Sequence, residues 1–434
     1  MKVLYFHQYF STPKGATGTR SYELARQLIA RGHDVTMVCG SAVLSDTGLQ
    51  SKSNRAICRG NVDGIDVIEI RLPYSNYDGL LKRTLTFLRY ALRAIGIAWR
   101  ERYDVLYATS TPLTAGIPGI AMRLLKPRHK FVFEVRDLWP ELPRAMGVVT
   151  NPVVLGGMSA LEKLSYSAMH AGVALSPGIH EGMTRRSRKT KPIEIIPNGC
   201  DLEIFHPSHG PNDGGGQLVP GFPSDGLRCV FTGAHGRANG LDAVLDAASV
   251  LRSRGRSDIH LVFIGDGKLK PQLVARCERE KLTNCHFLDP VPKRQLSTLM
   301  SQTDVSLMIL ANVPAFYYGT SPNKFFDYIS AGLPVVNNYP GWLADMIGQH
   351  ECGIAVPPEN PAAFAEALIR LADDPDLRRR MGRNARRLAE TEFNRLDLAN
   401  RLVDFLESIV SQRTDERAER VKVTVNHEYH EYHE

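Results

Sequence analysis

Residues 1–39 read MKVLYFHQYFSTPKGATGTRSYELARQLIARGHDVTMVC. Residues 2–6 form an apolar run typical of a buried strand, and residues 34–39 form a second one. Between them lie a loop over residues 7–18 and a stretch over residues 19–31 whose apolar side chains recur with helical spacing. A strand, a helix and another strand in this order predict parallel pairing, so the chain opens as a wound α/β sheet.

The alternation of short apolar runs and helical patterns continues along most of the chain. Further strands are expected at residues 66–70, 103–108, 130–135, 171–175, 193–196, 228–232, 259–264, 304–310 and 334–337. Residues 207–226, PSHGPNDGGGQLVPGFPSDG, interrupt this pattern because they are rich in glycine and proline and have no periodicity. They are predicted to link two α/β domains.

The predicted organisation therefore has five parts. These are an N-terminal domain (1–206), the linker (207–226), a C-terminal domain (227–395), a helix that crosses back to the first domain (396–420) and a tail (421–434). The tail ends in HEYHEYHE and is expected to be solvated and without a role in the chemistry.

Composition narrows the class of protein. Of the 434 residues, 43% are hydrophobic and 23% charged, which excludes a disordered chain. Lys and Arg exceed Asp and Glu by 53 to 46, which suggests an anionic partner. No dense basic block is interleaved with aromatic residues, so a nucleic-acid partner is not expected. The seven scattered cysteines lack CxxC spacing, which is typical of reduced thiols in a cytoplasmic protein. The first residues lack a signal-peptide core, and residues 105–122 are too polar to span a membrane.

The most informative segment is GTSPNKFFDYISAGLPVV, residues 319–336. Ser321 is a good N-cap and Pro322 falls at the first helical position, so a helix starts just after the strand at 304–310. Ligands bind at that carboxyl edge of a parallel sheet. The free N–H groups and dipole of the helix start favour an anion, and Lys324 adds a positive charge.

Asp327 follows Lys324 by three residues and Asn323 by four, so the three share one helix face. A carboxylate one turn below a phosphate site is well placed to accept hydrogen bonds from a ribose diol. The alternative is a structural helix with an ordinary Lys–Asp surface pair.

The run DYISAGLPVV, which begins at Asp327, resembles the acidic-residue and Gly-x-Pro-Val-Val signature of family 4 retaining glycosyltransferases. Three further blocks resemble that family in the right order: IPNGCD at 196–201, the glycine loop at 233–241 and VFIGDG at 262–267. The resemblance covers most of the chain. It implies the GT-B fold, an α/β architecture in which two Rossmann-like parallel-sheet domains face a cleft.

Within the family, DLWPE at 137–141 and PNK at 322–324 resemble a bacterial surface-polysaccharide branch that includes N-acetylfucosamine transferases. The resemblance implies retaining transfer of a sugar, an N-acetylated or deoxy hexose, from a UDP-sugar to a hydroxyl of a glycan or lipid-linked acceptor in cell-envelope polysaccharide synthesis. The nucleotide would bind the C-terminal domain and the acceptor the N-terminal domain.

The sequence also departs from the family. The usual Glu-x7-Glu pair has Asp327 at its second position but Gly319 at its first. The usual Arg and Lys of the second-domain loop are replaced by Ala234 and Asn239, which leaves Lys324 as the obvious cation for the diphosphate. The other donor-binding candidates in this domain are Gly233, His235, Arg237, Ser321 and Asn323.

Arg136 and Asp137 are the catalytic candidates, at a place where many relatives have His-Asp. Arg136 stays protonated and cannot act as a base, but it can hold a donor phosphate or an acceptor oxygen while Asp137 orients it or a substrate hydroxyl. A structural ion pair at a strand end is the alternative. His7 is expected to be structural or exposed rather than catalytic.

Gly15 and Gly18 precede a helix start, as in an anion-binding turn, although glycines in a plain connection would look the same. They do not form a GxGxxG fingerprint, so a dinucleotide enzyme is disfavoured. No DxD metal motif is visible, and N–H dipoles and cations can neutralise a departing diphosphate without one, so no metal or other cofactor is expected beside the UDP-sugar co-substrate.

A separate argument concerns residues 80–102, LLKRTLTFLRYALRAIGIAWRER. One helical stripe holds Leu81, Leu85, Leu88, Leu92, Ile95 and Trp99, and a neighbouring stripe holds Lys82, Arg89, Arg93 and Arg100. A basic row beside an apolar face suits a helix on anionic lipid, which would place the protein at the inner face of the cytoplasmic membrane. The alternative is an amphipathic helix packed on its own sheet, with its arginines in solvent.

Two other functions stay open. The first is another enzyme of the same fold, a nucleotide-sugar epimerase or a phosphorylase. The second is a non-catalytic protein that binds nucleotide or membrane in an envelope assembly, and the missing family residues favour it.

Overall fold

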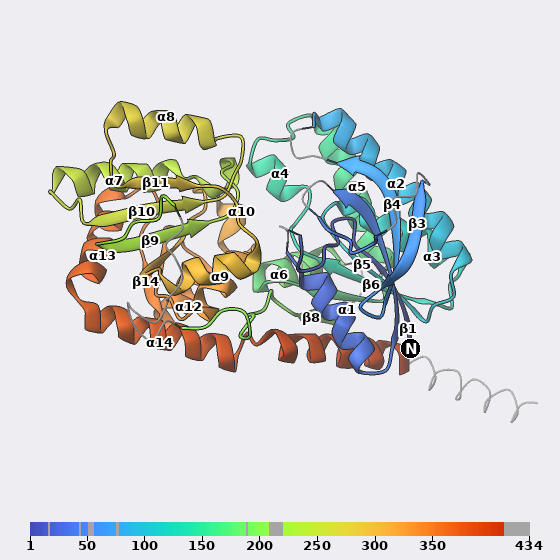
Figure 1. Ribbon diagram of the computed structural model, residues 1–434. Coiled ribbons are helices and arrows are strands. Elements are labelled where there is room, and N and C mark those ends of the chain that lie inside the picture. The colour runs from blue at the N-terminus through green and yellow to red at the C-terminus, as the bar shows by residue number, and fades with distance from the viewer. Residues whose placement is uncertain are drawn as a thin grey trace, which may run out of the picture.

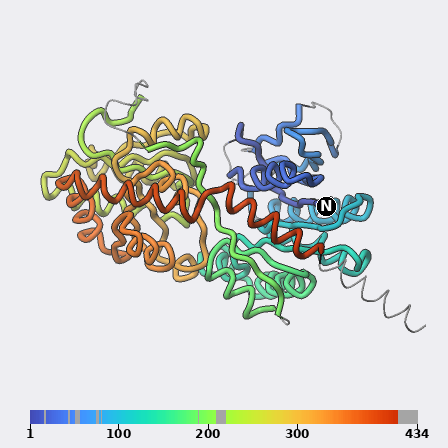
Figure 2. Tube along the Cα trace, turned by 90° about the horizontal axis from the view of Figure 1, so that it is seen from below, coloured from blue at the N-terminus to red at the C-terminus, as the bar shows by residue number. Residues whose placement is uncertain are grey.

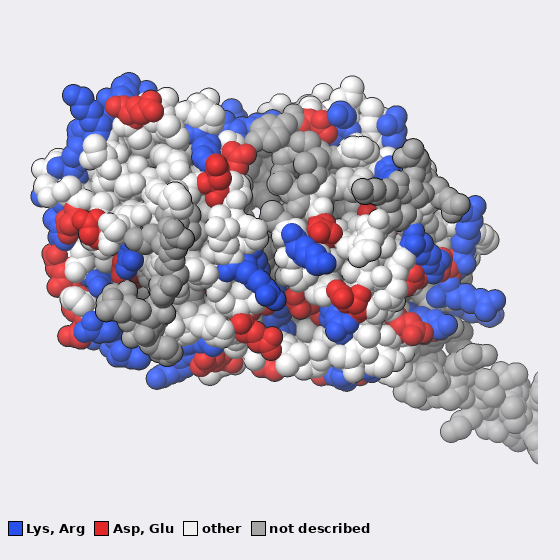
Figure 3. Space-filling view, viewed as in Figure 1, with Lys and Arg blue, Asp and Glu red and all other residues white. Residues whose placement is uncertain are grey.

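The computed structural model describes residues 1–15, 18–42, 45–50, 56–74, 78–187, 190–207 and 220–411. These residues form two α/β lobes, each built on one sheet, that lie side by side (Figure 1). On the face drawn in Figure 3, lysine and arginine side chains are interspersed with aspartate and glutamate, so neither sign of charge dominates it. The predicted fold class, two Rossmann-like parallel-sheet domains, is confirmed.

The first sheet has the strand order β3-β4-β2-β1-β5-β6-β7-β8 and is parallel except where β3 pairs with β4. Its strands are β1 (Lys2–Phe6), β2 (Asp34–Ala42), β3 (Ile57–Val62), β4 (Ile65–Tyr74), β5 (Val105–Thr109), β6 (Lys130–Val135), β7 (Ala171–Ala174) and β8 (Ile193–Ile195). Its helices are α1 (Arg20–Ala30), α2 (Leu80–Arg100), η1 (Leu113–Gly116), α3 (Ile117–Leu125), α4 (Glu141–Ala145), α5 (Pro152–Ala168) and α6 (Pro177–Arg186).

The second sheet has the order β11-β10-β9-β12-β13-β14 and is parallel throughout. Its strands are β9 (Leu227–Thr232), β10 (Ile259–Ile264), β11 (Cys285–Leu288), β12 (Val305–Met308), β13 (Val335–Asn337) and β14 (Gly353–Ala355). Its helices are η2 (Arg237–Asn239), α7 (Asp242–Ser253), α8 (Lys270–Glu280), α9 (Lys293–Ser301), α10 (Pro314–Tyr317), α11 (Asn323–Ser330), α12 (Trp342–Gln349), α13 (Pro361–Asp373) and α14 (Pro375–Thr391).

Every strand expected from the sequence is present, and β3, β11 and β14 are additional. β5 is buried along its whole length, whereas β3 and β14 have exposed positions. All three missed strands lie at sheet edges, where a continuous apolar run is not needed, although the edge strand β8 was found. Most of the predicted linker, 208–219, and the whole predicted tail lie outside the described residues.

The last described helix, residues 395–411, crosses from the second lobe to the first along the base of the molecule (Figures 1 and 2). Leu398, Leu402, Leu406 and Ile409 are buried in the same core cluster as α1. Polar contacts with the first domain accompany this packing: Gln27 to Asn400 at 2.7 Å and Arg31 to Asp404 at 3.0 Å. The predicted crossing helix is therefore confirmed to residue 411, and the rest of its predicted span is not described.

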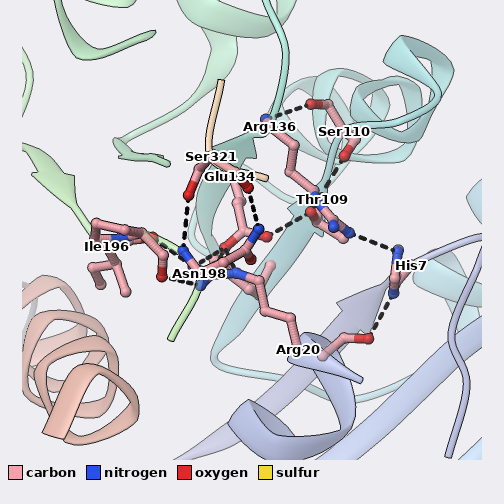
Figure 4. A network of polar contacts seen from close by, with 12 residues as sticks. His7, Arg20, Thr109, Ser110, Glu134, Arg136, Ile196, Asn198 and Ser321 are labelled. Carbon is pink, nitrogen blue, oxygen red and sulfur yellow. Dashed lines mark hydrogen bonds and ion pairs between the residues drawn. The ribbon is translucent and has the colours of Figure 1, made fainter. Parts of the chain in front are cut away.

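A buried ion pair lies at the centre of the first domain (Figure 4). Arg20, the first residue of α1, donates to the Glu134 carboxylate of β6 from Nε at 3.1 Å and from Nη2 at 2.8 Å. The hydroxyls of Tyr107 and Thr109 donate to the same carboxylate at 2.7 and 2.6 Å. Burial alone would raise the pKa of Glu134, but Arg20 outweighs it and lowers this pKa to about 2.

The Arg20 guanidinium also holds the segment through which the chain leaves the first domain. Arg20 also donates to the backbone carbonyls of Ile196 at 2.8 Å and Pro197 at 2.6 Å. The next residue, Asn198, crosses to the second domain: its backbone N–H donates to the Ser321 hydroxyl at 3.1 Å and its amide to the Ser321 carbonyl at 2.5 Å. The ion pair therefore fixes the chain where the domains meet.

Replacing Leu402 by alanine tests the packing of the crossing helix. Leu402 is fully buried, so the cavity should lower the free energy of unfolding by about 2–5 kcal/mol in a denaturant titration. Leu396→Ala on the same helix is the matched control, because Leu396 is 55% exposed and its loss should be near neutral. Equal effects of the two substitutions would contradict the crossing.

Glu134→Gln tests the ion pair, because it leaves Arg20 buried without its counter-charge. We expect a loss of about 3–5 kcal/mol in the free energy of unfolding. The pKa of Glu134 falls from 4.5 to about 2 on folding, so its stabilisation is complete above about pH 4.5 and disappears as the pH falls through about 2. The variant should lack this part of the acid dependence. An unchanged acid dependence would show that Glu134 is not held ionised by Arg20.

Candidate functional site

The predicted anion-binding elements of the two domains meet face to face. Gly18 lies two residues before α1 and Asn323 begins α11, and a Cβ on Gly18 would lie only 2.9 Å from the Asn323 amide nitrogen. Gly15 donates from its backbone N–H to the Thr12 carbonyl at 3.1 Å and closes a turn ahead of this contact. The structure thus brings together Gly18 and the start of α11, whereas Gly15 contacts its own loop.

A second contact closes the domains on one another beside α11. The backbone N–H of Gly178 and the hydroxyl of Ser176 both donate to the Tyr318 carbonyl, at 3.1 and 2.7 Å. Ser176 and Gly178 belong to the start of α6, in the first domain, whereas Tyr318 precedes α11 in the second. The carboxyl ends of the two sheets therefore face each other.

The predicted N-cap role of Ser321 is wrong. α11 begins at Asn323, and Pro322 occupies the cap position with an extended backbone. The Ser321 hydroxyl is instead taken by the backbone N–H of Asn198, since this residue is part of the interdomain contact. The Phe325 N–H donates to the Pro322 carbonyl at 3.1 Å, but no side chain of the described residues caps the start of α11, so the N–H groups of Asn323 and Lys324 stay available to an anion.

Lys324 lies against the glycine loop of the second domain. Its Nζ donates to the Asn239 side-chain oxygen at 2.6 Å and sits 4.1 Å from the centre of the Phe231 ring. A Cβ on Gly233, whose φ is +128°, would lie 3.5 Å from the same Nζ. Burial lowers the pKa of Lys324 to about 7, so a bound anion would stabilise its charged form. Asn239 stands where the family has a lysine in this loop. Its side-chain oxygen accepts the hydrogen bond from Lys324 of α11.

The two remaining loop candidates are not alike. His235 has no exposed surface, packs among Phe231, Phe263 and Phe287, and has no hydrogen-bond partner on either ring nitrogen. Its prediction as a diphosphate ligand is wrong, because the ring points into this aromatic cluster; burial lowers its pKa to about 4. Arg237 lies in η2 with an exposed side chain and remains a candidate.

Asp327 belongs to a cluster of charges that the sequence did not reveal. Its carboxylate lies 3.7 Å from Lys293 Nζ, and Lys293 also pairs with Asp201. Arg395 pairs with Asp201 at 2.8 Å. Burial raises the pKa of Asp327, while Lys293 and Arg395 oppose that rise. Asp201 and Arg395 are far apart in sequence from α11, so no spacing rule could bring them to Asp327.

His7 orients Arg136, which the sequence did not predict (Figure 4). Arg136 Nη1 lies 3.3 Å from His7 Nε2, and His7 Nδ1 lies 2.6 Å from the Ser21 hydroxyl. A guanidinium can only donate, so Nε2 must accept and the proton of the ring must sit on Nδ1. Burial and Arg136 accordingly lower the pKa of His7 to about 3. His7 is structural, as expected, but it acts directly on a catalytic candidate.

Among the described residues, no hydrogen bond joins Asp137 to Arg136. The Asp137 carboxylate instead accepts one from the Thr111 hydroxyl at 3.1 Å. Burial raises its pKa, and Arg136 and Thr111 oppose the rise. The Arg136 backbone N–H donates to the Ser110 hydroxyl at 3.0 Å, which fixes the strand end. The two candidates therefore take different partners in the same region rather than forming a simple pair.

Gly319 explains why the family's first glutamate is absent. A Cβ at this position would lie 2.6 Å from the Ala315 carbonyl oxygen. The turn between α10 and α11 is thus too tight for any side chain, and a glutamate would require the backbone to move. A group that would hold a donor sugar in this protein must therefore differ from the family's first glutamate.

The apolar row of α2 faces outward. Leu81, Leu88, Leu92 and Trp99 are 75%, 42%, 68% and 54% exposed. The face packed on the domain consists instead of Thr86, Tyr90, Ala91, Ala94, Ile97 and Ala98. α2 therefore packs on its own domain with the arginines of its basic row exposed, as the alternative expects, but through a face that takes only Ile95 from the predicted apolar row. Lys82, Arg89, Arg93 and Arg100 are also exposed.

Two absences hold for the part of the chain that the structure describes. None of its helices has the length and apolar content needed to cross a membrane. No group of three or more His, Cys, Asp and Glu side chains within it is arranged to hold a metal ion.

Comparisons with known proteins agree with this geometry. A family described as "Glycosyl transferase 4-like domain" matches residues 15–199, and one described as "Glycosyl transferases group 1" matches residues 219–388. The chain is 29% identical over 214 residues, 46% of its length, to a D-inositol 3-phosphate glycosyltransferase of Streptomyces avermitilis. It is 30% identical over 157 residues, 36% of its length, to the D-rhamnosyltransferase WbpZ of Pseudomonas aeruginosa. These segments span 43% and 39% of the two relatives.

Solved structures share the whole architecture. Sucrose-phosphate synthase from Thermosynechococcus elongatus superposes with a TM-score of 0.72 and 18% identity, over 95% of this chain and 99% of that one. The Anabaena protein HepE, solved with UDP and glucose, gives a TM-score of 0.64 and 14% identity over 94% and 100%. Each half of the chain therefore matches a glycosyltransferase family, in the order of a two-domain transferase, and the chain as a whole has the GT-B fold.

Proposed function

We propose that the protein transfers a sugar from a UDP-sugar to a hydroxyl of a glycan or lipid-linked acceptor, with retention of the anomeric configuration. One observation carries the proposal. The uncapped start of α11 places its N–H groups, Lys324 and, one turn on, Asp327 at the carboxyl edge of the second sheet, opposite the Gly18 loop of the first.

The diphosphate would bind the start of α11, where the N–H groups and the helix dipole favour negative charge and Lys324 supplies a cation. The ribose hydroxyls would donate to Asp327. Arg237, exposed on η2, would reach the outer phosphate. The neighbour HepE, which shares the fold and was solved with UDP and with UDP-glucose, supports a nucleotide sugar as the ligand.

The chemistry needs a stabilised leaving group more than a protein base. As the glycosidic bond to the diphosphate breaks, charge develops on the phosphate oxygens, and preorganised N–H groups and cations lower that barrier without a metal. In retention the departing phosphate takes the acceptor proton on the same face. Arg136, oriented by His7, would hold a phosphate or acceptor oxygen, and Asp137 an acceptor hydroxyl. The closed domains would exclude water.

The sugar is proposed to be an N-acetylated or deoxy hexose, in cell-envelope polysaccharide synthesis. The resemblance to the surface-polysaccharide branch supports this choice. The side-chain-free Gly319 supports it too, because the site lacks the carboxylate that would bind a pair of sugar hydroxyls.

We further propose that α2 rests on the anionic inner face of the cytoplasmic membrane. Its exposed leucines and Trp99 would enter the headgroup region while the basic row meets lipid phosphates. α2 packs beside α3, whose end adds Leu124 and Leu125, 80% and 53% exposed. The basic row supports lipid over a protein partner, because it flanks the apolar row along the helix.

A donor panel tests the transferase proposal. The purified protein, incubated with UDP-sugars and EDTA, should release UDP from one donor when an acceptor extract is present. Asp327→Ala and Lys324→Ala should each lower the rate by about a hundredfold, since removal of one transition-state donor costs about that much. Lys163→Ala, at an exposed position of α5 in the first domain, should leave it unchanged. Release that survives both substitutions, or no release and no thermal stabilisation by UDP, would contradict the nucleotide site.

Vesicle flotation tests the membrane face. Changing Lys82, Arg89, Arg93 and Arg100 to glutamine should reduce co-flotation with phosphatidylglycerol-rich vesicles at least tenfold, because each basic residue near such a surface contributes about 1 kcal/mol. The matched control changes four exposed arginines of α14, namely Arg379, Arg380, Arg383 and Arg387. Equal losses in both variants, or flotation that stays unchanged in the first, would contradict an oriented α2 contact.

A further inference from the structure

A compact set of charges lies where the second domain, the interdomain chain and the crossing helix meet. The hinge cluster consists of Asp201, Lys293, Asp327 and Arg395. Their side chains are 12%, 19%, 15% and 16% exposed, so solvent screens them only in part. They come from four different parts of the chain: the segment after β8, the start of α9, the middle of α11 and the start of the last helix.

Three carboxylates lie in or beside the cluster. Asp201 and Asp327 belong to it, and Glu23 of α1 faces Arg395, Asp201 and Lys293 from the first domain. Burial raises the pKa of Glu23 as well as that of Asp327. Arg26 of α1 also opposes the rise at Glu23. Asp201 and Asp327, by contrast, share the two cations Lys293 and Arg395, so loss of either cation leaves these aspartates with less compensation.

Lys293 is the cation closest to Asp327. Its Nζ bridges the two aspartates, pairing with Asp201 and lying 3.7 Å from Asp327. Arg395 is committed elsewhere: besides Asp201 it donates to the Thr19 hydroxyl at 3.1 Å and the Gly199 carbonyl at 3.0 Å. The other titratable neighbours, Cys200 and Tyr328, are neutral, because burial raises the pKa of both above the physiological range.

We propose that Lys293 is a positioning residue of the nucleotide site: it keeps Asp327 ionised and aimed so that the carboxylate can accept both ribose hydroxyls. This inference rests on the proposed function, which gives Asp327 the ribose. A protonated Asp327 presents a donor from one of its oxygens, so it could not accept one ribose hydroxyl on each oxygen as the carboxylate can.

The same contacts connect the ribose to the first domain. From Asp327 the contacts pass through Lys293 to Asp201, then to Nη1 of Arg395, which also donates to the hydroxyl of Thr19 beside Gly18. A lysine that bridges the two aspartates therefore links the nucleotide side of the site to the loop that faces α11.

The test compares dissociation constants for UDP in Lys293→Met and the unsubstituted protein between pH 5.5 and 8. The ratio of the two constants cancels the titration of UDP itself and of Lys324. Without Lys293, the carboxylate of Asp327 should become protonated at a pH closer to neutral. The dissociation constant of Lys293→Met, divided by that of the unsubstituted protein, should therefore be small at pH 8 and rise to about tenfold or more at pH 5.5. This ratio can change by at most about tenfold per pH unit.

Three further variants sharpen this test. Lys293→Arg keeps the charge and should restore a flat ratio. Lys293→Met in an Asp327→Asn background should lose the acid-dependent effect, because the titrating group is gone. Lys163→Met, which removes an exposed lysine of α5, is the matched charge control and should follow the unsubstituted protein at every pH.

The outcomes separate the two claims. A ratio that is constant with pH, or an acid-dependent ratio that persists with Asp327→Asn, would overturn the role of Lys293 and leave a structural contact. If UDP binds neither the unsubstituted protein nor any variant, the proposed nucleotide site fails and the inference fails with it. If UDP binds and Asp327→Asn leaves the affinity unchanged, the ribose assignment alone is overturned.

Discussion

The ion pair between Arg20 and Glu134 organises the molecule. Two buried charges of opposite sign are stable only when hydrogen bonds satisfy their remaining atoms, and here Tyr107 and Thr109 complete the carboxylate while two backbone carbonyls complete the guanidinium. Those carbonyls belong to the segment that leaves the first sheet. One buried pair therefore determines the start of α1, the end of β6 and the place where the chain enters the second domain.

Contacts between the two domains, rather than a single helix or strand, hold the candidate site together. Asn198 holds Ser321, which precedes α11, and Gly18 approaches Asn323 at the start of the same helix. The arrangement puts the anion-binding helix start under control of both domains. The proposed nucleotide site is consequently built by both domains, which suits an enzyme that must keep water from its donor.

The sequence predicted the fold well, because buried parallel strands leave continuous apolar runs, and it placed Lys324 and Asp327 on α11 from local rules alone. It failed where partners are distant. A serine before a proline is typical of an N-cap, yet the Ser321 hydroxyl accepts a hydrogen bond from the backbone N–H of Asn198 instead. His235 lies in a predicted binding loop, yet its ring enters an aromatic cluster. Lys293 and Arg395 carried no motif, since their importance comes only from tertiary contact with Asp327 and Asp201.

The central claim is that a nucleoside diphosphate binds between α11 and the Gly18 loop, and a crystal structure with UDP tests it most directly. We expect the diphosphate to bind at the start of α11, within hydrogen-bond distance of Lys324, and both ribose hydroxyls to donate to Asp327. A nucleotide bound elsewhere, or one whose ribose contacts neither oxygen of Asp327, would contradict it.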